Sequence, residues 1–272
     1  MTAFIIASAS IFSTSLILAL IYLLFLIRPR KDVKPSDALI CHYAHRGLHN
    51  KEIPENSLAA FEAACKAGYG MELDVQLSRD GVVMVFHDYT LLRMTGCNKK
   101  LCELDSNELS SLTLSGSDQT IPTFEHVLAL VDGRAPILIE IKGEDNNTLI
   151  CEKVAALLKD YKGPYCLESF NPKFIGTMKK HLPKAYRGLL YANVCRAKRK
   201  GHVLSILLTA MAFNAMAKPH FIAYNKEDRD SLPVKIATKL YGAQSFVWTL
   251  NTAEEFEKAK SLGEWVIFEG IE

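Results

Sequence analysis

Seven charged or titratable residues stand out because they fall near the ends of short apolar runs. They are Glu72, Asp74, Glu140, His45, His87, Arg46 and Lys142. Three carboxylates without a thiolate suit a hard cation, so they predict a Ca²⁺ or Mg²⁺ site rather than a zinc site. Histidines exchange protons near neutral pH, and Arg and Lys hold phosphate oxygens. These residue types together predict a phosphoryl-transfer site.

The elements that must position these residues alternate between short β-branched runs and amphipathic stretches. Strands are expected over residues 41–46, 71–77, 82–87, 137–142, 165–170, 187–191, 221–225, 245–250 and 264–268. Helices are expected over 58–67, 148–159, 172–181 and 232–241, and from Thr252 to Gly263. Repeated β–α units predict an α/β fold, a (β/α)8 TIM barrel. A doubly wound open sheet is the alternative, but no Gly-rich phosphate loop supports it.

The turn Arg79-Asp80-Gly81 accounts for the ninth strand. Asp-Gly between two apolar runs is typical of a β-hairpin, so residues 82–87 should form a small hairpin insertion after the second strand. If Asp80 and Gly81 are the two loop residues, Asp74 lies opposite His87 on one face of the hairpin. In a barrel, side chains at the carboxyl ends of strands converge on the active-site mouth.

The order of these motifs resembles the glycerophosphodiester phosphodiesterase family over nearly all of residues 40–270. The matching runs are His45-Arg46-Gly47, Pro54-Glu55-Asn56-Ser57, Glu72-Leu73-Asp74, Asp80-Gly81, His87-Asp88, Glu140-Ile141-Lys142, Ser169-Phe170 and Trp248-Thr249-Leu250-Asn251. The resemblance implies a TIM barrel with a small insertion after the second strand. It also implies cleavage of glycerophosphodiesters to an alcohol and sn-glycerol 3-phosphate, with a divalent cation.

The resemblance also implies a role for each matching residue. His45 and His87 would be the general acid/base pair; Glu72, Asp74 and Glu140 the metal ligands; Arg46 and Lys142 the phosphate-binding residues. Glu55 would support His45 and Arg46, and Trp248 would line the pocket for glycerol or the leaving group.

The last strand departs from the family pattern. Phe268-Glu269-Gly270 stands where members commonly carry an Asp-Gly-Ile-Ile-Thr-Asp-like strand end. The substrate preference therefore stays open, and a lysophospholipase D-like activity on lysophospholipids is one alternative. A non-catalytic, membrane-anchored barrel that acts as a scaffold or sensor is the other, although a binding role would not require both histidines.

Residues 3–27 carry no charge, and about 20 apolar residues are enough to span a bilayer. Residues 1–34 are therefore expected to be a transmembrane anchor with a basic juxtamembrane segment, and residues 35–272 the barrel. A cleaved signal is the alternative, but no Lys or Arg precedes the run and no Ala-x-Ala-like site follows it. The flanking Arg28, Arg30, Lys31 and Lys34 predict a single-pass protein of the cell membrane with its barrel in the cytoplasm.

The net charge is +2, of which the segment up to Lys34 contributes +3, so the rest is nearly neutral. A general nucleic-acid binder would need a strongly basic face and is excluded. Seven cysteines without CxxC spacing predict reduced thiols rather than a disulfide framework or a zinc site. The expected partners are the substrate and the lipid bilayer, and the oligomeric state stays open.

A second apolar stretch, residues 203–217, follows a basic cluster of Arg196, Lys198, Arg199 and Lys200. At 15 residues it is too short to span a bilayer. It is either a barrel helix buried against the sheet or an interfacial helix that lies on anionic lipid.

Overall fold

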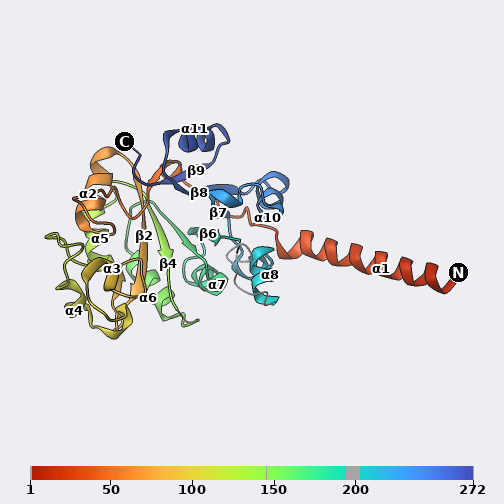
Figure 1. Cartoon of the computed structure of the whole chain (residues 1–272), viewed down its shortest axis with the longest axis horizontal. Helices are drawn as coiled ribbons and strands as arrows, with labels where there is room; N and C mark the ends of the chain where they lie inside the picture. The colour runs from red at the N-terminus through yellow and green to blue at the C-terminus, as the bar shows by residue number, and fades with distance from the viewer. Residues whose placement is uncertain (1, 145, 194–202, 272) are drawn as a thin grey trace.

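Eight parallel strands close into a barrel in the computed structural model, which describes residues 2–144, 146–193 and 203–271 (Figure 1). The strands are β1 (Tyr43–Ala44), β2 (Gly70–Leu77), β4 (Ile137–Ile141), β5 (Tyr165–Ser169), β6 (Tyr186–Tyr191), β7 (Phe221–Asn225), β8 (Gln244–Leu250) and β9 (Trp265–Phe268). Each pairs with its neighbour in parallel, and β1 closes the ring by pairing with both β2 and β9. The predicted TIM barrel is confirmed.

Helices follow most of the strands and cover the outside of the barrel. They are α2 (Leu58–Ala67), α5 (Phe124–Val131), α6 (Leu149–Leu158), α7 (Pro172–His181), α8 (Val203–Thr209), α9 (Asn214–Ala217), α10 (Leu232–Lys235) with its π-helical continuation η5 (Ile236–Leu240), and α11 (Ala253–Ser261). Short 3-10 turns occur at η2 (Asp37–Leu39) and η4 (Lys226–Asp228). Local signals set the ends: the Ser57 hydroxyl accepts the Ala60 N–H, and Gly68 closes α2 with a φ of 76°.

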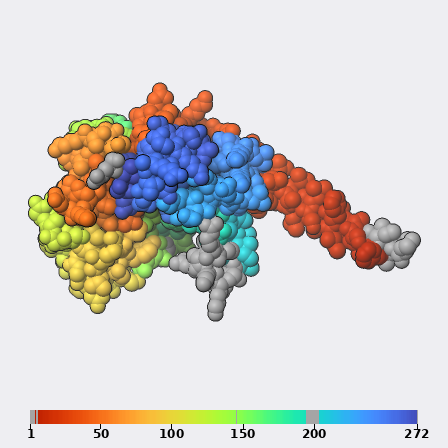
Figure 2. Space-filling view, turned by 45° about the horizontal axis from the view of Figure 1, so that its top comes forward, coloured from red at the N-terminus to blue at the C-terminus, as the bar shows by residue number. Residues whose placement is uncertain are grey.

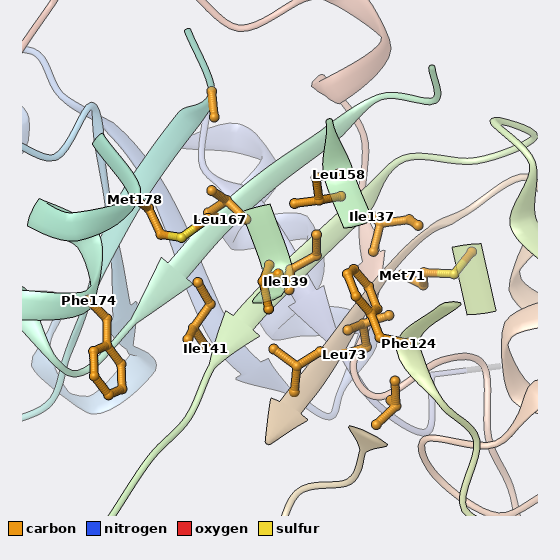
Figure 3. Close-up of a cluster of buried hydrophobic side chains, with 14 of the residues drawn as sticks. Met71, Leu73, Phe124, Ile137, Ile139, Ile141, Leu158, Leu167, Phe174 and Met178 are labelled. Atoms are coloured by element: carbon orange, nitrogen blue, oxygen red, sulfur yellow. The ribbon is translucent and has the colours of Figure 1, made fainter. Parts of the chain in front are cut away.

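Successive side chains along the strands alternate between two faces. The side chains that pack against the helices lie on one face, and those that could take part in chemistry lie on the other. Odd-numbered residues of β2 and β4, such as Met71, Leu73 and Ile139, pack outward against Phe124 of α5 and other helix residues (Figure 3). The even-numbered residues therefore point into the barrel, because successive side chains of a strand face opposite ways. A second cluster that includes Tyr43, Leu138, Phe221 and Phe246 fills the barrel interior, so the polar residues gather above a packed floor.

The insertion after β2 is larger than a hairpin. It begins with β3 (Val83–Val85), which runs antiparallel to β2, and continues through α3 (Leu92–Thr95), η3 (Leu101–Glu103) and α4 (Ser106–Ser110). Apolar residues of this segment, among them Met84, Leu91 and Leu109, form a cluster of their own. The insertion is thus a small lobe with a separate core beside the barrel.

The predicted register of the hairpin is wrong by one residue. Leu77 pairs with Val83, and the Ser78 N–H donates to the Val82 carbonyl, so the loop holds Arg79, Asp80 and Gly81. Gly81 has a φ of 78°, as the last residue of a three-residue hairpin loop requires. Asp74 consequently bonds to the backbone of Phe86 rather than lying opposite His87.

The N-terminal helix α1 (Thr2–Ile21) continues into the π-helix η1 (Tyr22–Leu26) and projects away from the barrel (Figures 1 and 2). The stretch Ile6–Leu26 is long and apolar enough to cross a membrane, and a signal sequence would satisfy the same test. The end of this stem is seated in the barrel: the Tyr22 hydroxyl donates to the Ala210 carbonyl, and the Asn214 amide donates to the carbonyl of the buried Ile27.

Residues 203–217 do not form the single helix that the sequence predicts. The chain breaks between α8 and α9, where Met211 adopts a φ of 53°. The basic cluster expected before this stretch lies outside the described residues. Of the seven cysteines, Cys195 also lies outside, and the other six are free thiols.

Candidate active site

A cavity of about 130 Å³ opens at the carboxyl ends of the barrel strands. Its lining contains His45, Arg46, Glu72, His87, Glu140, Glu168, Lys142 and Trp248. Asp74 lies beside it, with contacts to both Arg46 and Lys142. Of the residues that the sequence assigns to the site, only Glu55 stays farther back, where it contacts Arg46. The structure therefore brings residues from both ends of the chain to one place.

Three of the carboxylates are close enough to share a cation. One oxygen each from Glu72, Asp74 and Glu140 lies within 4.8 Å of the others, and all three residues are buried. Strand pairing explains this, because β2 and β4 lie side by side with Asp74 in register with Glu140. Glu140 is in turn in register with Glu168 of β5, so a fourth buried carboxylate adjoins the group.

Burial and mutual repulsion disfavour ionisation of most of these carboxyl groups. Burial raises the pKa of Glu140 to about 7, although Lys142 opposes the shift. Burial and the neighbouring carboxylates raise the pKa of Glu72 and Glu168 well above their ordinary values. Asp74 differs: burial would raise its pKa, but Lys142, His87 and Arg46 outweigh burial and lower it.

Two basic residues neutralise only part of this acidic cluster. The Lys142 ammonium lies 3.2 Å from Oδ1 of Asp74 and 3.0 Å from Oε1 of Glu140. The Arg46 side chain lies 3.7 Å from Oδ2 of Asp74. Within the described residues, Oε2 of the buried Glu168 has no hydrogen-bond donor. Four buried carboxyl groups therefore face two cations, a donor set that fits a divalent ion.

His45 follows β1 and is held by a carboxylate from the other end of the chain. Its backbone N–H donates to the Phe268 carbonyl, and its Nδ1 lies 2.9 Å from Oε2 of Glu269. Glu269 also lies 3.6 Å from Nε2 of His49. With Nδ1 donating to Glu269, the Nε2 atom of His45 carries the lone pair of the neutral ring.

His87 has a matching partner in the next residue. Its Nδ1 lies 2.6 Å from Oδ1 of Asp88, and Arg93 donates to the other oxygen of Asp88 at 2.6 Å. Arg93 also bonds to Glu55, which accepts a hydrogen bond from Arg46 at 2.7 Å. Burial lowers the pKa of His87, so its imidazole is neutral near pH 7 despite the nearby Asp74.

The turn after β1 aims the Arg46 backbone and side chain at the acidic cluster. Arg46 has a φ of 56°, and its N–H donates to Oε2 of Glu72 at 2.9 Å. Gly47 follows with a φ of 82°, and a Cβ there would lie 2.8 Å from the Cβ of Ala60. The glycine of this motif is thus required by both conformation and close packing.

One wall of the cavity is aromatic. Trp248 of β8 packs edge-on against Phe170, with ring centroids 5.8 Å apart. The peptide bond between Trp248 and Thr249 is cis. Both rings line the cavity and give it an apolar side.

Several residues at the site were not assigned from the sequence. Glu168 falls at a strand end, but no motif in the sequence indicates a role for it, and His49 belongs to no motif. Glu269 could only have been found through the departure of the last strand from the family pattern. Arg93 belongs to the inserted lobe, and no local pattern indicated that it would join Asp88 to Glu55.

Comparisons with known proteins agree with this geometry. The sequence profile of the glycerophosphoryl diester phosphodiesterase family matches residues 45–269. The chain is 30% identical over 233 residues to a glycerophosphodiester phosphodiesterase of Caldanaerobacter subterraneus subsp. tengcongensis, covering 81% of this chain and 89% of that protein. It is 27% identical over 260 residues to the lysophospholipase D GDPD1 of Homo sapiens, and the match covers 82% of this chain and 80% of that protein.

Solved structures show the same fold. An Oleispira antarctica phosphodiesterase in complex with the product sn-glycerol-3-phosphate is 23% identical, with a TM-score of 0.70 over 84% of this chain and 92% of that one. A glycerophosphodiester phosphodiesterase from Thermotoga maritima is 28% identical, with a TM-score of 0.65, and the match covers 84% of this chain and 93% of that one. Fold and sequence together define a TIM-barrel phosphodiesterase. The chain belongs to the glycerophosphodiester phosphodiesterase family.

Proposed function

We propose that this enzyme hydrolyses glycerophosphodiesters to an alcohol and sn-glycerol 3-phosphate with a divalent cation, Ca²⁺ or Mg²⁺. The observation that carries the proposal is the convergence on one cavity of three clustered carboxylates, two carboxylate-paired histidines and two cations. The relatives named above support the substrate class.

Glu72, Asp74 and Glu140 are the residues that would hold the metal ion. Their oxygens lie within 4.8 Å of one another, and hard carboxylate ligands suit either ion. Four buried carboxyl groups crowd together here, and Oε2 of Glu168 has no hydrogen-bond donor among the described residues. A bound cation would stabilise their ionised forms, so this crowding supports a metal site. When bound, the ion would supply Lewis-acid stabilisation of charge on the phosphate oxygens.

Arg46 and Lys142 would bind and orient the phosphate. Both side chains line the cavity. Burial would lower the pKa of Lys142, but the adjacent Asp74 and Glu140 outweigh burial and raise it, so the ammonium stays protonated. Glu55 positions Arg46 through the 2.7 Å hydrogen bond. Positive groups held in place before the reaction stabilise the transition state without a cost of reorganisation.

His45 and His87 would carry the protons. One imidazole Nε2 accepts the proton of the nucleophile, and the other donates a proton to the departing alkoxide. Glu269 and Asp88 each stabilise the imidazolium that forms at their partner histidine. The nucleophile is either water or the adjacent hydroxyl of the substrate, and the second route would pass through a cyclic phosphate.

Trp248, with Phe170, would contact the glycerol or the leaving group on the apolar side of the cavity. At about 130 Å³ the cavity suits a small phosphoglycerol group, so the rest of a larger substrate would extend outward. A second candidate function follows, namely lysophospholipase D-like cleavage of a lysophospholipid. The apolar stem and the human relative that bears this name favour it.

Residues 1–34 would anchor residues 35–272 to the cell membrane by a single span. The basic residues that follow the apolar run favour a cytoplasmic barrel. An anchor of this kind would hold the enzyme at a lipid surface, the source of either class of substrate.

A release assay tests these proposals together. The full chain is incubated with glycerophosphocholine or lysophosphatidylcholine, with added Mg²⁺ or Ca²⁺ and with EDTA, and choline and glycerol 3-phosphate are measured. Release of glycerol 3-phosphate from glycerophosphocholine that EDTA abolishes is the expected result. Turnover of lysophosphatidylcholine alone would support the second candidate. No turnover of either substrate with metal present would favour a scaffold.

A further inference from the structure

A hollow of about 610 Å³ lies at the base of the stem, where η1 meets the barrel. Its lining combines the apolar Leu24 and Phe25 with four basic residues, Arg28, Arg30, Lys31 and Lys218. It shares no lining residue with the active-site cavity. The proposed reaction therefore leaves this hollow without a role.

The basic residues come from two distant segments that backbone contacts hold together. The Arg30 N–H donates to the Pro219 carbonyl at 2.7 Å, next to Lys218. Oδ1 of Asp32 lies 3.1 Å from Nε2 of the buried His220, within hydrogen-bond distance. The Arg28 guanidinium lies 5.9 Å from the ring centroid of Tyr241, also in the lining. The position of the positive charge is thus built into the fold.

Most of this positive charge is not balanced. Asp32 is the acidic residue in the lining, and it lies 3.7 Å from Arg30. Within residues 2–144, 146–193 and 203–271, no carboxylate comes within ion-pair distance of Arg28, Lys31 or Lys218. Three cations around one hollow favour an anionic ligand, and phosphate oxygens accept hydrogen bonds from both Arg and Lys.

The hollow also lies where an apolar run ends. Arg28 comes two residues after Leu26, the last residue of the stretch long enough to span a bilayer. Leu240 of η5, which lines the hollow, is 64% exposed, and Val203 and Leu204 of α8 are 73% and 57% exposed. Figure 1 shows α8 and α10 on opposite sides of the place where α1 leaves the barrel, and Figure 2 shows the light-blue surface near residue 235 beside the red stem.

We infer that this hollow binds the phosphate headgroup of an anionic phospholipid. The cations would hold the phosphate, while Leu24, Phe25 and Leu240 would contact the acyl chains beside the stem. The combination of basic and apolar lining at the end of a span selects a lipid over a free anion, because a free anion gains nothing from the apolar side chains. The inference depends on the proposed span, and it is independent of the proposed catalysis.

Lipid retention by the full chain tests this site. The protein is reconstituted in phosphatidylcholine with or without phosphatidylglycerol, and bound lipids are counted by native mass spectrometry. The wild type should retain phosphatidylglycerol in preference to phosphatidylcholine. The triple variant R28Q/K31Q/K218Q should bind phosphatidylglycerol about 100-fold more weakly and K218Q about fivefold more weakly, since each basic side chain at the lipid surface contributes about a factor of five.

A matched variant, K99Q/K153Q/K159Q, removes the same charge from exposed sites on the inserted lobe, on α6 and at the C-cap of α6. It should retain lipid as the wild type does. Equal retention by both triple variants would overturn the site. Displacement of the lipid by inorganic phosphate at equal concentration would show a free-anion site instead.

Release of the wild type from membranes by alkaline carbonate would overturn the span and the lipid site together. Unchanged hydrolysis of glycerophosphocholine by R28Q/K31Q/K218Q would show that it is folded, and a wild type that is inactive but retains lipid would contradict only the catalysis.

Discussion

The Nδ1 atom of His45 lies 2.9 Å from Oε2 of Glu269, a residue 224 positions later in the chain. The contact is possible because β1 and β9 are neighbours in the closed barrel and each residue directly follows its strand. A side chain from the last strand thereby fixes the tautomer of an imidazole on the first. The same pairing recurs between His87 and Asp88, so each of these two cavity-lining histidines has Nδ1 paired with a carboxylate.

Replacing Glu269 should impair the reaction less than replacing His45. General acid–base catalysis contributes about 10²–10⁴-fold, so H45A should lose activity in that range. In E269Q the amide oxygen still accepts the imidazole N–H, but it no longer stabilises the imidazolium, and we expect about a tenfold loss of kcat with little change in KM. Steady-state kinetics on glycerophosphocholine measure both effects. E254Q, at an exposed site on α11, is the control, and wild-type activity in E269Q would rule out the role of Glu269.

Glu140→Gln should weaken metal binding and leave the protein folded. A ligand at 100 times its dissociation constant stabilises a protein by about 2.7 kcal/mol. A tenfold weaker site at the same metal concentration gains about 1.4 kcal/mol less. Thermal unfolding of the full chain in detergent, with Mg²⁺ or Ca²⁺ and with EDTA, should therefore show a smaller metal-induced shift for E140Q.

In EDTA, without bound metal, E140Q should be at least as stable as the wild type. Burial raises the pKa of Glu140 to about 7, so the ionised group opposes folding at pH 8, and E140Q should unfold at or above the wild-type temperature. E152Q, exposed on α6, should match the wild type in both conditions. An unchanged metal response in E140Q would exclude Glu140 as a ligand.

Gly47→Ala should destabilise the enzyme more than Gly263→Ala. Both glycines have a positive φ, 82° and 70°, but an added Cβ at Gly47 would lie 2.8 Å from Ala60, whereas nothing lies within 4 Å at Gly263. Backbone strain of about 1–2 kcal/mol applies to both, and overpacking adds about 1–3 kcal/mol at Gly47 only. Thermal unfolding midpoints compare the two variants, and equal shifts would show that the chain around Ala60 yields without cost.

His220 should make the fold sensitive to mild acid. Burial lowers its pKa to about 4, and its Nδ1 accepts the Arg187 N–H while its Nε2 contacts Asp32. The unfolded chain binds a proton near pH 6.5 and the folded one does not, so stability is complete above pH 6.5 and falls as the pH drops toward 4. At pH 5 the loss is about 2 kcal/mol relative to pH 7.5, or about 4–8 °C in Tm.

H220N isolates this effect from the titration of the acidic cluster, because the Asn oxygen can replace Nδ1 as the acceptor of the Arg187 N–H while the titrating ring is removed. Its midpoint should fall less than that of the wild type between pH 7.5 and 5.0. An identical fall in both proteins would place the acid sensitivity elsewhere.

The parts of the fold that depend on local pattern could be predicted from the sequence. Alternation in Met71-Glu72-Leu73-Asp74 indicates which face is buried against helices and which carries the carboxylates, and the structure has that arrangement. The Asp80-Gly81 turn predicted a hairpin correctly but not its loop length. Two-residue and three-residue loops both use a glycine at positive φ, so the register could not be chosen from the residue types alone.

Contacts set by tertiary packing could not be predicted in this way. The side chain of Arg93 reaches from the inserted lobe to Asp88 and Glu55, and Glu269 reaches His45 only once the barrel is closed. The break in residues 203–217 likewise depends on the stem, since the Asn214 amide bonds to the Ile27 carbonyl. The residue types in this stretch gave no sign of that partner.

The buried Ile27 gives the stem a mechanical role. The Ile27 side chain lies in the barrel core, and hydrogen bonds from Tyr22 and Asn214 hold the chain around it. The stem is therefore joined rigidly to the barrel rather than through a flexible linker. In the proposed single-span arrangement, this rigid joint would keep the cavity at one height and tilt over the bilayer, so the enzyme would reach only diesters at that distance from the membrane surface.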